Sequence, residues 1–210
     1  MGITGMRYIW TVAVIAVIVA GMLGVGRAGE SLTSAGVHAA ENVYKVDPAH
    51  SSIIFQIRHF GIANFYGMVT APTGTVLLDD PDAAVLEIEI QTKYVNGGND
   101  SRNRFLASPD FFNVREYPKA SFKAESIRRI DESTFEADGI FTMRGVSRPL
   151  TVRLTGYAER TIEKFGHRCA FETTFTINRS EFGMDSHLED ESLGDEVTIT
   201  VSIEAARPAE

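Results

Sequence analysis

Histidine and acidic side chains are the residues of this chain with the clearest capacity for metal binding or proton transfer. His50 and His59 lie nine residues apart, and in an undistorted strand an odd separation places two side chains on opposite faces. We therefore do not expect them to share a metal ion. His187 lies in the acidic stretch 185–191, which lacks the Asp/Asn-Gly register of a calcium loop. We interpret that stretch as a solvated loop and predict no metal site.

The sequence contains no familiar catalytic motif. It has no Gly-x-Ser-x-Gly elbow, no His-Glu-x-x-His pair and no glycine-rich phosphate loop before a helix. The single cysteine, Cys169, falls on the apolar face of a predicted strand, which indicates a buried structural thiol. We predict no catalytic residue. An enzyme is still an alternative, with His59 and either Asp110 or Glu181 as its general acid and base.

Strands must position these residues, because apolar and polar side chains alternate along most of the chain after residue 50. The predicted strands are 52–60, 65–78, 86–93, 120–130, 135–143, 150–155, 168–177 and 196–204. Short polar or glycine-bearing connections favour antiparallel neighbours. No long amphipathic helix follows the leader, which excludes α/β and TIM-barrel folds.

The connection 97–117 interrupts this pattern, and we predict two short helical turns within it. Asp100 and Ser108 are the expected N-caps, and Pro109 would occupy the first helical position of the second turn. The fold class is therefore all-β, an eight-stranded antiparallel barrel that closes because an open sheet would leave unpaired edges.

The interior of such a barrel is either packed or large enough for one ligand. Its predicted inward positions are rich in Phe, which suits an acyl or prenyl chain better than a sugar or nucleotide. The residues expected to contact a lipid are Phe55, Ile57, His59, Phe65, Phe105, Phe111, Phe112, Phe122, Phe141, Phe171 and Phe175. A packed barrel that acts as a protein-interaction domain is the other interpretation.

The first forty residues have the composition of an export segment. Arg7 precedes an uncharged, mostly apolar run over residues 8–26, and Val37-His38-Ala39 is similar to a small-x-small cleavage site. The run also approaches the ~20 residues that span a bilayer, so an uncleaved N-terminal anchor is an alternative. Residues 41–210 then form one domain outside the cytoplasm, periplasmic or secreted, or held at the inner membrane if the leader remains.

The charge balance excludes one class of partner. The chain has 28 acidic and 20 basic residues, a net charge of -8, and a pI near 5.2. Binding to a phosphate backbone relies on Lys and Arg, so nucleic acid is not an expected partner. One cysteine permits no intrachain disulfide.

Several motifs, in order along the chain, carry a resemblance to the YceI family. They are 44–55 (YKVDPAHSSIIF), 58–61 (RHFG), 102–106 (RNRFL), 108–112 (SPDFF), 117–122 (YPKASF), Gly139, 142–150 (TMRGVSRPL), 178–184 (NRSEFGM) and 195–197 (DEV). Together they span essentially all of residues 43–205. The resemblance implies an exported, lipocalin-like barrel that holds a polyisoprenoid, an isoprenoid quinone or a fatty-acid derivative, and requires no other cofactor. It also implies a membrane cytochrome or a stress response as a possible context.

Arginines recur in these motifs, at positions 58, 102, 104, 144, 148 and 179. Arg58, Arg102 and Arg104 are the expected contacts of an anionic head group. Where the family has an Arg-Asp pair followed by His-Leu, this chain has Asn103 and Phe105. The exchange makes the rim more positive, which favours a phosphorylated or carboxylated head group.

Overall fold

The computed structural model describes residues 42–80 and 83–207. The predicted export segment or anchor, residues 1–40, lies outside the described residues. Within the described ranges, no helix is both long and apolar enough to cross a membrane.

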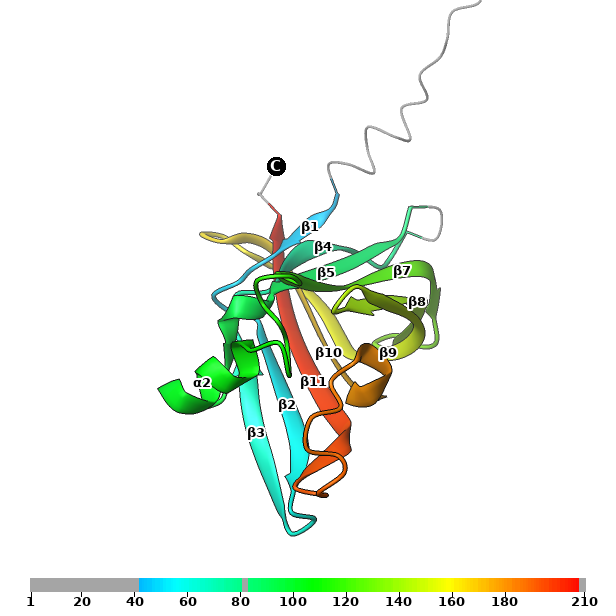
Figure 1. Ribbon diagram of the computed structural model, residues 1–210. Helices are drawn as coiled ribbons and strands as arrows, with labels where there is room; N and C mark the ends of the chain where they lie inside the picture. The colour runs from blue at the N-terminus through cyan, green and yellow to red at the C-terminus, as the bar shows by residue number, and fades with distance from the viewer. Residues whose placement is uncertain (1–41, 81–82, 208–210) are drawn as a thin grey trace, which may run out of the picture. The chain divides into compact units, whose positions relative to one another are not determined.

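The described chain is a succession of antiparallel strands with little helix (Figure 1). The first strands are β1 (Tyr44–Val46), β2 (Ser52–His59), β3 (Ala63–Val69), β4 (Thr73–Leu77), β5 (Val85–Gln91) and β6 (Val95–Asn96). The later strands are β7 (Lys119–Arg129), β8 (Phe135–Met143), β9 (Val146–Ile162), β10 (Gly166–Asn178) and β11 (Leu193–Arg207). Two 3-10 helices, η1 (Thr92–Tyr94) and η2 (Arg179–Phe182), accompany the α-helix α2 (Asp100–Ala107).

The sheet closes into a barrel because β1 pairs with β4 on one side and with β11 on the other. Three strands around the barrel are interrupted: β1 continues as β2, β3 as β4, and β5 as β6. The registers support this, since β2 pairs with β3 while β1 pairs with β4, and β3 also pairs with β6. The predicted eight-stranded antiparallel barrel is confirmed.

The connection between β6 and β7 contains one helix where we predicted two helical turns. The N-cap of α2 is Asn99, whose side chain accepts a hydrogen bond from the Arg102 backbone N–H at 2.9 Å. Ser108 is the C-cap, and its backbone N–H donates to the Phe105 carbonyl at 3.1 Å. Both predicted N-caps, Asp100 and Ser108, were therefore wrong. The segment after Ser108 forms turns instead of a second helix.

One end of the barrel is filled by side chains. Strand β1 and the C-terminal half of β11 meet there, as the pairing of Val46 with Ala205 shows. The residues packed at this end are each at most 4 % exposed: Tyr44, Val76, Phe135, Ala137, Leu154, Cys169, Ile203 and Ala205. Any internal space must therefore lie toward the other end, where the β2–β3 hairpin projects (Figure 1).

Candidate functional site

The barrel encloses a cavity of about 630 Å³. This volume falls within the range of about 300–1,000 Å³ that is typical of pockets for small molecules. Its wall comes from β2, β3, β5, β7–β11, α2 and the segments that follow α2 and η2. Aliphatic and aromatic side chains make up most of the lining, so the site is suited to an apolar ligand.

All eleven residues that we expected to contact a lipid line this cavity. They are Phe55, Ile57, His59, Phe65, Phe105, Phe111, Phe112, Phe122, Phe141, Phe171 and Phe175. Several of their rings are in contact with one another: the centroid distances are 4.6 Å for Phe105 and Phe111, and 6.0 Å for Phe141 and Phe175. Aromatic rings from separate elements therefore pack against one another in the apolar wall.

The strand registers define the depth of the cavity. Ile53 on β2 pairs with Val69 and with Val201, and these three residues are buried near the floor. His59, six residues further along β2, is exposed and pairs with Leu193 at the start of β11. The exposed lining residues mark the mouth, and they are His59, Phe60, Ala63, Asn64, Arg102, Phe105 and His187.

Helix α2 supplies one edge of the mouth. The guanidinium of Arg102 lies 4.5 Å from the centroid of the Phe65 ring, and its Nη1 donates to the Gly97 carbonyl at 2.5 Å. The Phe105 ring reaches the imidazole of His187, with centroids 5.7 Å apart. Segments that are far apart in sequence therefore meet at the mouth.

A glycine on β3 makes room for one of the lining rings. A Cβ on Gly67 would lie 2.1 Å from the Cζ atom of Phe55. These two residues are cross-strand partners, so the Phe55 ring lies over the side-chain-free backbone of Gly67. Gly67 therefore determines how far this ring projects into the cavity.

Of the three arginines predicted to contact a head group, only Arg102 lines the cavity. The Arg58 guanidinium instead donates to the Asn64 side chain at 2.8 Å and to the Gly61 carbonyl at 2.6 Å. Arg104 is exposed on α2 outside the lining. Asn103, the unusual residue of this motif, accepts from the Gly97 N–H at 2.6 Å and is occupied in holding the loop before α2.

Two polar residues of the wall, Thr173 and Arg179, are buried and lie outside the predicted set of site residues. Thr173 follows the inward pattern of β10 between Phe171 and Phe175, is 6 % exposed, and its hydroxyl has no hydrogen-bond partner among the described residues. Its position in the two-residue period was the available signal. Arg179 lies in η2, which interrupts the strand period, so its signal in the sequence was its place in the family-like motif 178–184.

Arg179 is 2 % exposed, yet it also lines the cavity. Its guanidinium donates to the carbonyls of Gly194 at 2.8 Å, Met184 at 2.6 Å and Leu193 at 3.1 Å. Burial lowers the pKa of this guanidinium from its ordinary value, and the charges of Asp195 and Asp185 oppose that shift. Arg179 thus ties η2 to the beginning of β11 beside the cavity.

The residues considered for catalysis are not brought together. His59 lies at the mouth, whereas Asp110 and Glu181 are exposed and neither lines the cavity. Cys169 is 1 % exposed, and burial raises the pKa of its thiol to about 12. The predicted buried structural thiol is confirmed, since a thiol with so high a pKa forms almost no thiolate at neutral pH.

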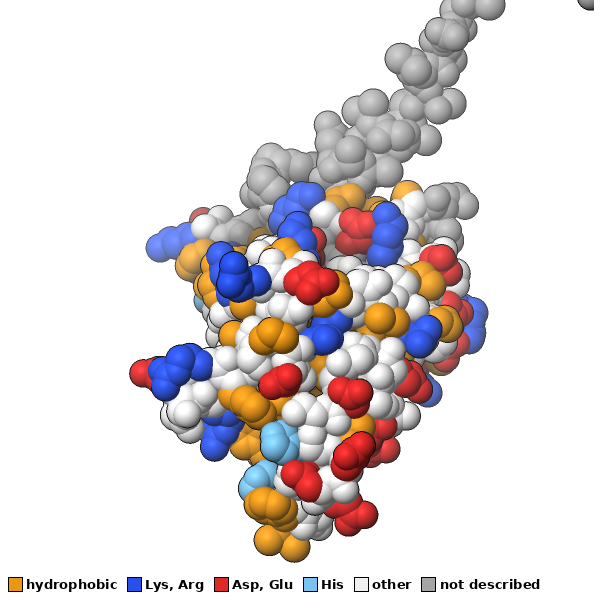
Figure 2. Space-filling model, in the orientation of Figure 1, with side chains coloured by type: hydrophobic (Ala, Val, Ile, Leu, Met, Phe, Trp, Pro, Cys, Tyr) orange, Lys and Arg blue, Asp and Glu red, His pale blue; other side chains and the backbone are white. Residues whose placement is uncertain are grey.

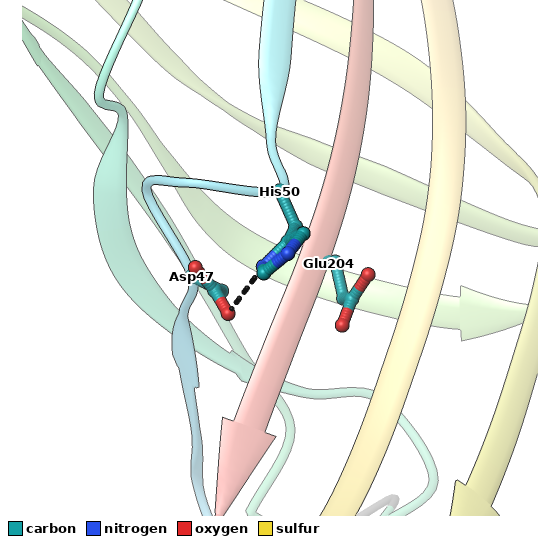
Figure 3. Close-up of side chains that lie close together, drawn as sticks. All are labelled: Asp47, His50 and Glu204. Atoms are coloured by element: carbon teal, nitrogen blue, oxygen red, sulfur yellow. Dashed lines mark hydrogen bonds and ion pairs between the residues drawn. The ribbon is translucent and has the colours of Figure 1, made fainter. Parts of the chain in front are cut away.

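A second cluster lies on the outside of the barrel, where Asp47, His50 and Glu204 each offer a metal-ligand atom (Figure 3). These atoms all lie within 4.8 Å of one another. The Nη1 atom of Arg168, however, lies 2.7 Å from the Asp47 carboxylate and 3.0 Å from that of Glu204. The guanidinium already supplies the positive charge between the two acids, so we interpret the cluster as an ion-pair network that joins β10 and β11 to the segment after β1.

Fold and cavity together define a class: a small antiparallel β-barrel, packed at one end, with an apolar binding chamber that opens at the other. A model of the YceI-like domain matches residues 44–205. A UPF0312 protein of Pseudomonas savastanoi is 30% identical over 159 residues, which cover 74% of this chain and 83% of that protein. The chain belongs to the YceI family.

Solved structures share the fold. Burkholderia cenocepacia BcnA matches with a TM-score of 0.68 at 23% identity, over 77% of this chain and 99% of that one. A polyisoprenoid binding domain from Saccharophagus degradans matches with a TM-score of 0.63 at 13% identity, over 79% of this chain and 98% of that one. The architecture is therefore retained where few residues are identical.

Proposed function

We propose that this protein binds a long-chain amphiphilic lipid in its barrel and carries it, the lipid being a polyisoprenoid, an isoprenoid quinone or a fatty-acid derivative. The observation that carries the proposal is the cavity of about 630 Å³ with its wall of aromatic and aliphatic side chains. The name of the Saccharophagus degradans domain, a polyisoprenoid binding domain, supports the same ligand class.

The distribution of polar groups explains why an amphiphile suits this site. The buried part of the wall can take up a hydrocarbon tail at roughly 0.8 kcal/mol per buried methylene. The exposed end offers the charged Arg102 together with the rings of His59 and His187. A ligand with its tail at the floor and its polar group at the mouth satisfies both ends.

Arg102 is the residue that we assign to the head group, because it alone of the three predicted arginines lines the cavity. An anionic head group would gain a charge-assisted hydrogen bond there. Calorimetric titration with a prenyl diphosphate and with its neutral alcohol tests this assignment. We expect tighter binding of the diphosphate, and a loss of that difference in Arg102→Gln. Equal affinities of the wild-type protein for the two ligands would contradict it.

Binding and carriage fit this site better than catalysis. A general acid–base pair must lie within hydrogen-bond reach of the same reacting group, and His59 has neither Asp110 nor Glu181 beside it on the cavity wall. Turnover of an added lipid that disappears in His59→Ala would overturn this preference.

The predicted leader places the protein outside the cytoplasm, in the periplasm or at the outer face of the inner membrane. Intact mass spectrometry of the chain recovered from its native host distinguishes a cleaved leader from a retained anchor. Recovery of the full-length chain in the cytoplasmic fraction would contradict export.

Two matched variants test the location of the lipid. Ile199→Trp places an indole in the cavity, because Ile199 lines it. Thr198→Trp is the control, because the preceding residue of β11 lies outside the lining. The affinity for geranylgeraniol, measured by its displacement of a fluorescent fatty acid, should fall at least about tenfold in Ile199→Trp and remain near the wild-type value in Thr198→Trp. Equal affinities of both variants and the wild type would refute the interior site.

A further inference from the structure

The turn between β2 and β3 exposes large apolar side chains beside the cavity mouth. Ile62 is 81 % exposed and Phe60 is 59 % exposed. A hydrogen bond of 3.1 Å from the Ile62 N–H to the His59 carbonyl closes the turn. Phe60 also lines the cavity, so this hairpin tip, residues 59–62, is continuous with the mouth.

The backbone of this turn makes the aromatic residue more unusual. Phe60 has φ of 50° and Gly61 has φ of 65°. Two successive positive φ values are typical of a type I′ hairpin turn, where Asn or Gly is preferred at the first position. A bulky residue is uncommon there. Phe60 is thus both strained in its backbone and exposed to water. Neither property stabilises the hairpin, so stability does not explain the residue at this position.

Exposed apolar residues are concentrated on this hairpin. The part of the chain that the structure describes has ten exposed large hydrophobic residues, and five of them lie between residues 54 and 68. They are Ile54, Phe60, Ile62, Tyr66 and Met68. Phe60 and Ile62 lie at the tip, whereas Ile54 and Met68 are cross-strand partners farther along the hairpin. Hydrophobic side chains also cover the lower end of the molecule in Figure 2, where Figure 1 places this hairpin. Two large, exposed apolar side chains at one hairpin tip, next to an apolar mouth, are typical of an interaction surface.

Charges of both signs surround the tip. Arg58 is anchored to the Gly61 carbonyl within the hairpin, and Arg102 stands at the same mouth. The acidic stretch 185–191 also borders the tip, since the Phe60 N–H donates at 2.9 Å to the carbonyl of Ser192, the residue that follows this stretch. A mixture of cations and anions around an apolar tip matches the zwitterionic surface of a phospholipid bilayer better than a strongly charged partner.

We propose that the hairpin tip inserts into the interfacial region of a lipid bilayer and holds the cavity mouth against it. This inference rests on the proposed function, because a long amphiphile would then move between bilayer and cavity without exposing its methylenes to water. Ile62 acts as the membrane contact, while Phe60 connects that contact to the cavity wall.

A fluorophore attached at the tip tests insertion in the full chain. Ile62→Cys can be labelled selectively, because the single native cysteine, Cys169, is 1 % exposed. Phe165→Cys is the matched control, because Phe165 is 64 % exposed and lies just before β10. The first residues of β10 pair with the C-terminal end of β11, whereas the hairpin lies beside the N-terminal end of β11. With phosphatidylcholine vesicles, an environment-sensitive dye at residue 62 should shift to the blue and be quenched by spin-labelled lipids, while the dye at residue 165 should not respond.

Three results would overturn the proposal. They are no response at residue 62, an equal response at both positions, or a response at residue 62 that depends on protein concentration without vesicles, which would indicate self-association. The control at residue 165 separates tip insertion from adsorption through another part of the chain.

Lipid transfer provides a second measurement. Ile62 lies outside the cavity lining, so Ile62→Asn should keep the affinity for geranylgeraniol and slow its uptake from vesicles about tenfold. An unchanged uptake rate would contradict docking through the tip. Absence of lipid binding by the wild-type protein would refute the proposed function, whereas the fluorescence experiment would still decide membrane insertion.

Discussion

Thr173 introduces an unsatisfied hydroxyl into an otherwise apolar wall. The residue is 6 % exposed, and within residues 42–80 and 83–207 its hydroxyl has no hydrogen-bond partner. A buried polar group without a hydrogen bond costs about 1–3 kcal/mol, and Val has nearly the shape of Thr. Thr173→Val should therefore raise the free energy of unfolding by about 1 kcal/mol in urea denaturation.

The neighbouring residue provides the control for this substitution. Thr174 is exposed, and its hydroxyl pairs with that of Thr200 at 3.0 Å. Thr174→Val should change the free energy of unfolding by less than about 0.5 kcal/mol. A loss of stability in Thr173→Val would mean that the Thr173 hydroxyl is satisfied in solution.

The pair of Asp47 and His50 should make stability depend on pH. Its hydrogen bond of 2.9 Å raises the pKa of His50, and this same bond together with Arg168 lowers the pKa of Asp47. The aspartate contribution is complete above its ordinary pKa, about 3.9, and is lost on acidification. The histidine contribution is complete below about 6.5 and is lost as the pH rises through the raised pKa of the folded state.

The stability difference between the wild-type protein and His50→Ala should therefore be largest near pH ~5 and smaller at both lower and higher pH. Thermal unfolding over a pH series measures this difference. In an Asp47→Asn background, the stability difference caused by His50→Ala should no longer have a maximum near pH ~5. A difference that does not vary with pH in the wild-type background would show that the pair does not form in solution.

At the level of elements, the fit between β2 and β3 depends on Gly67. Because a Cβ there would lie 2.1 Å from the Phe55 ring, Gly67→Ala must push this ring toward the cavity or separate the strands. We expect a loss of about 1–3 kcal/mol of stability together with weaker lipid binding.

A double-mutant cycle separates this clash from a general effect on β3. Phe55→Leu removes the ring, so Gly67→Ala should be less damaging in the Phe55→Leu background than alone. Chemical denaturation and probe displacement measure the two effects. Strict additivity of the two substitutions would show that Phe55 and Gly67 do not interact.

Most of the fold could be predicted from the alternation of apolar and polar side chains along the strands. A strand with one buried face must repeat every two residues, so β2, β8 and β10 were recognisable from the sequence, and their inward residues were assigned to the correct side. The breaks between β1 and β2 or β5 and β6 leave no comparable pattern. Helix ends are also set by local competition: Asn99 and Asp100 are both good caps, and only the backbone conformation decides that Asn99 takes the role.

Contacts that depend on barrel closure could not be predicted. Arg168 reaches Asp47 across 121 residues of chain, which requires the register of β1 with β11. The same limit applies to the head-group arginines: Arg58, Arg102 and Arg104 look equivalent in sequence, but only the hairpin geometry commits Arg58 to the Gly61 carbonyl.

At the scale of the whole molecule, the barrel has two different ends. The end where β1 closes the sheet is packed solid, and the cavity extends from there to the mouth beside the β2–β3 hairpin. The proposed amphiphile would place its tail toward Ile53 and Val201, which line the cavity near its floor, and its polar group near Arg102 at the mouth. Filling the chamber should therefore displace the lipid without disturbing the outer surface.

Organic extraction of the purified protein, followed by mass spectrometry, shows directly whether the barrel holds a lipid. We predict one unmodified long-chain amphiphile per chain in the wild type and in Thr198→Trp, and a strongly reduced amount in Ile199→Trp. Lipid binding inside the barrel would be contradicted if the wild-type protein contained no lipid and took up none when it was added, or if Ile199→Trp retained a full equivalent.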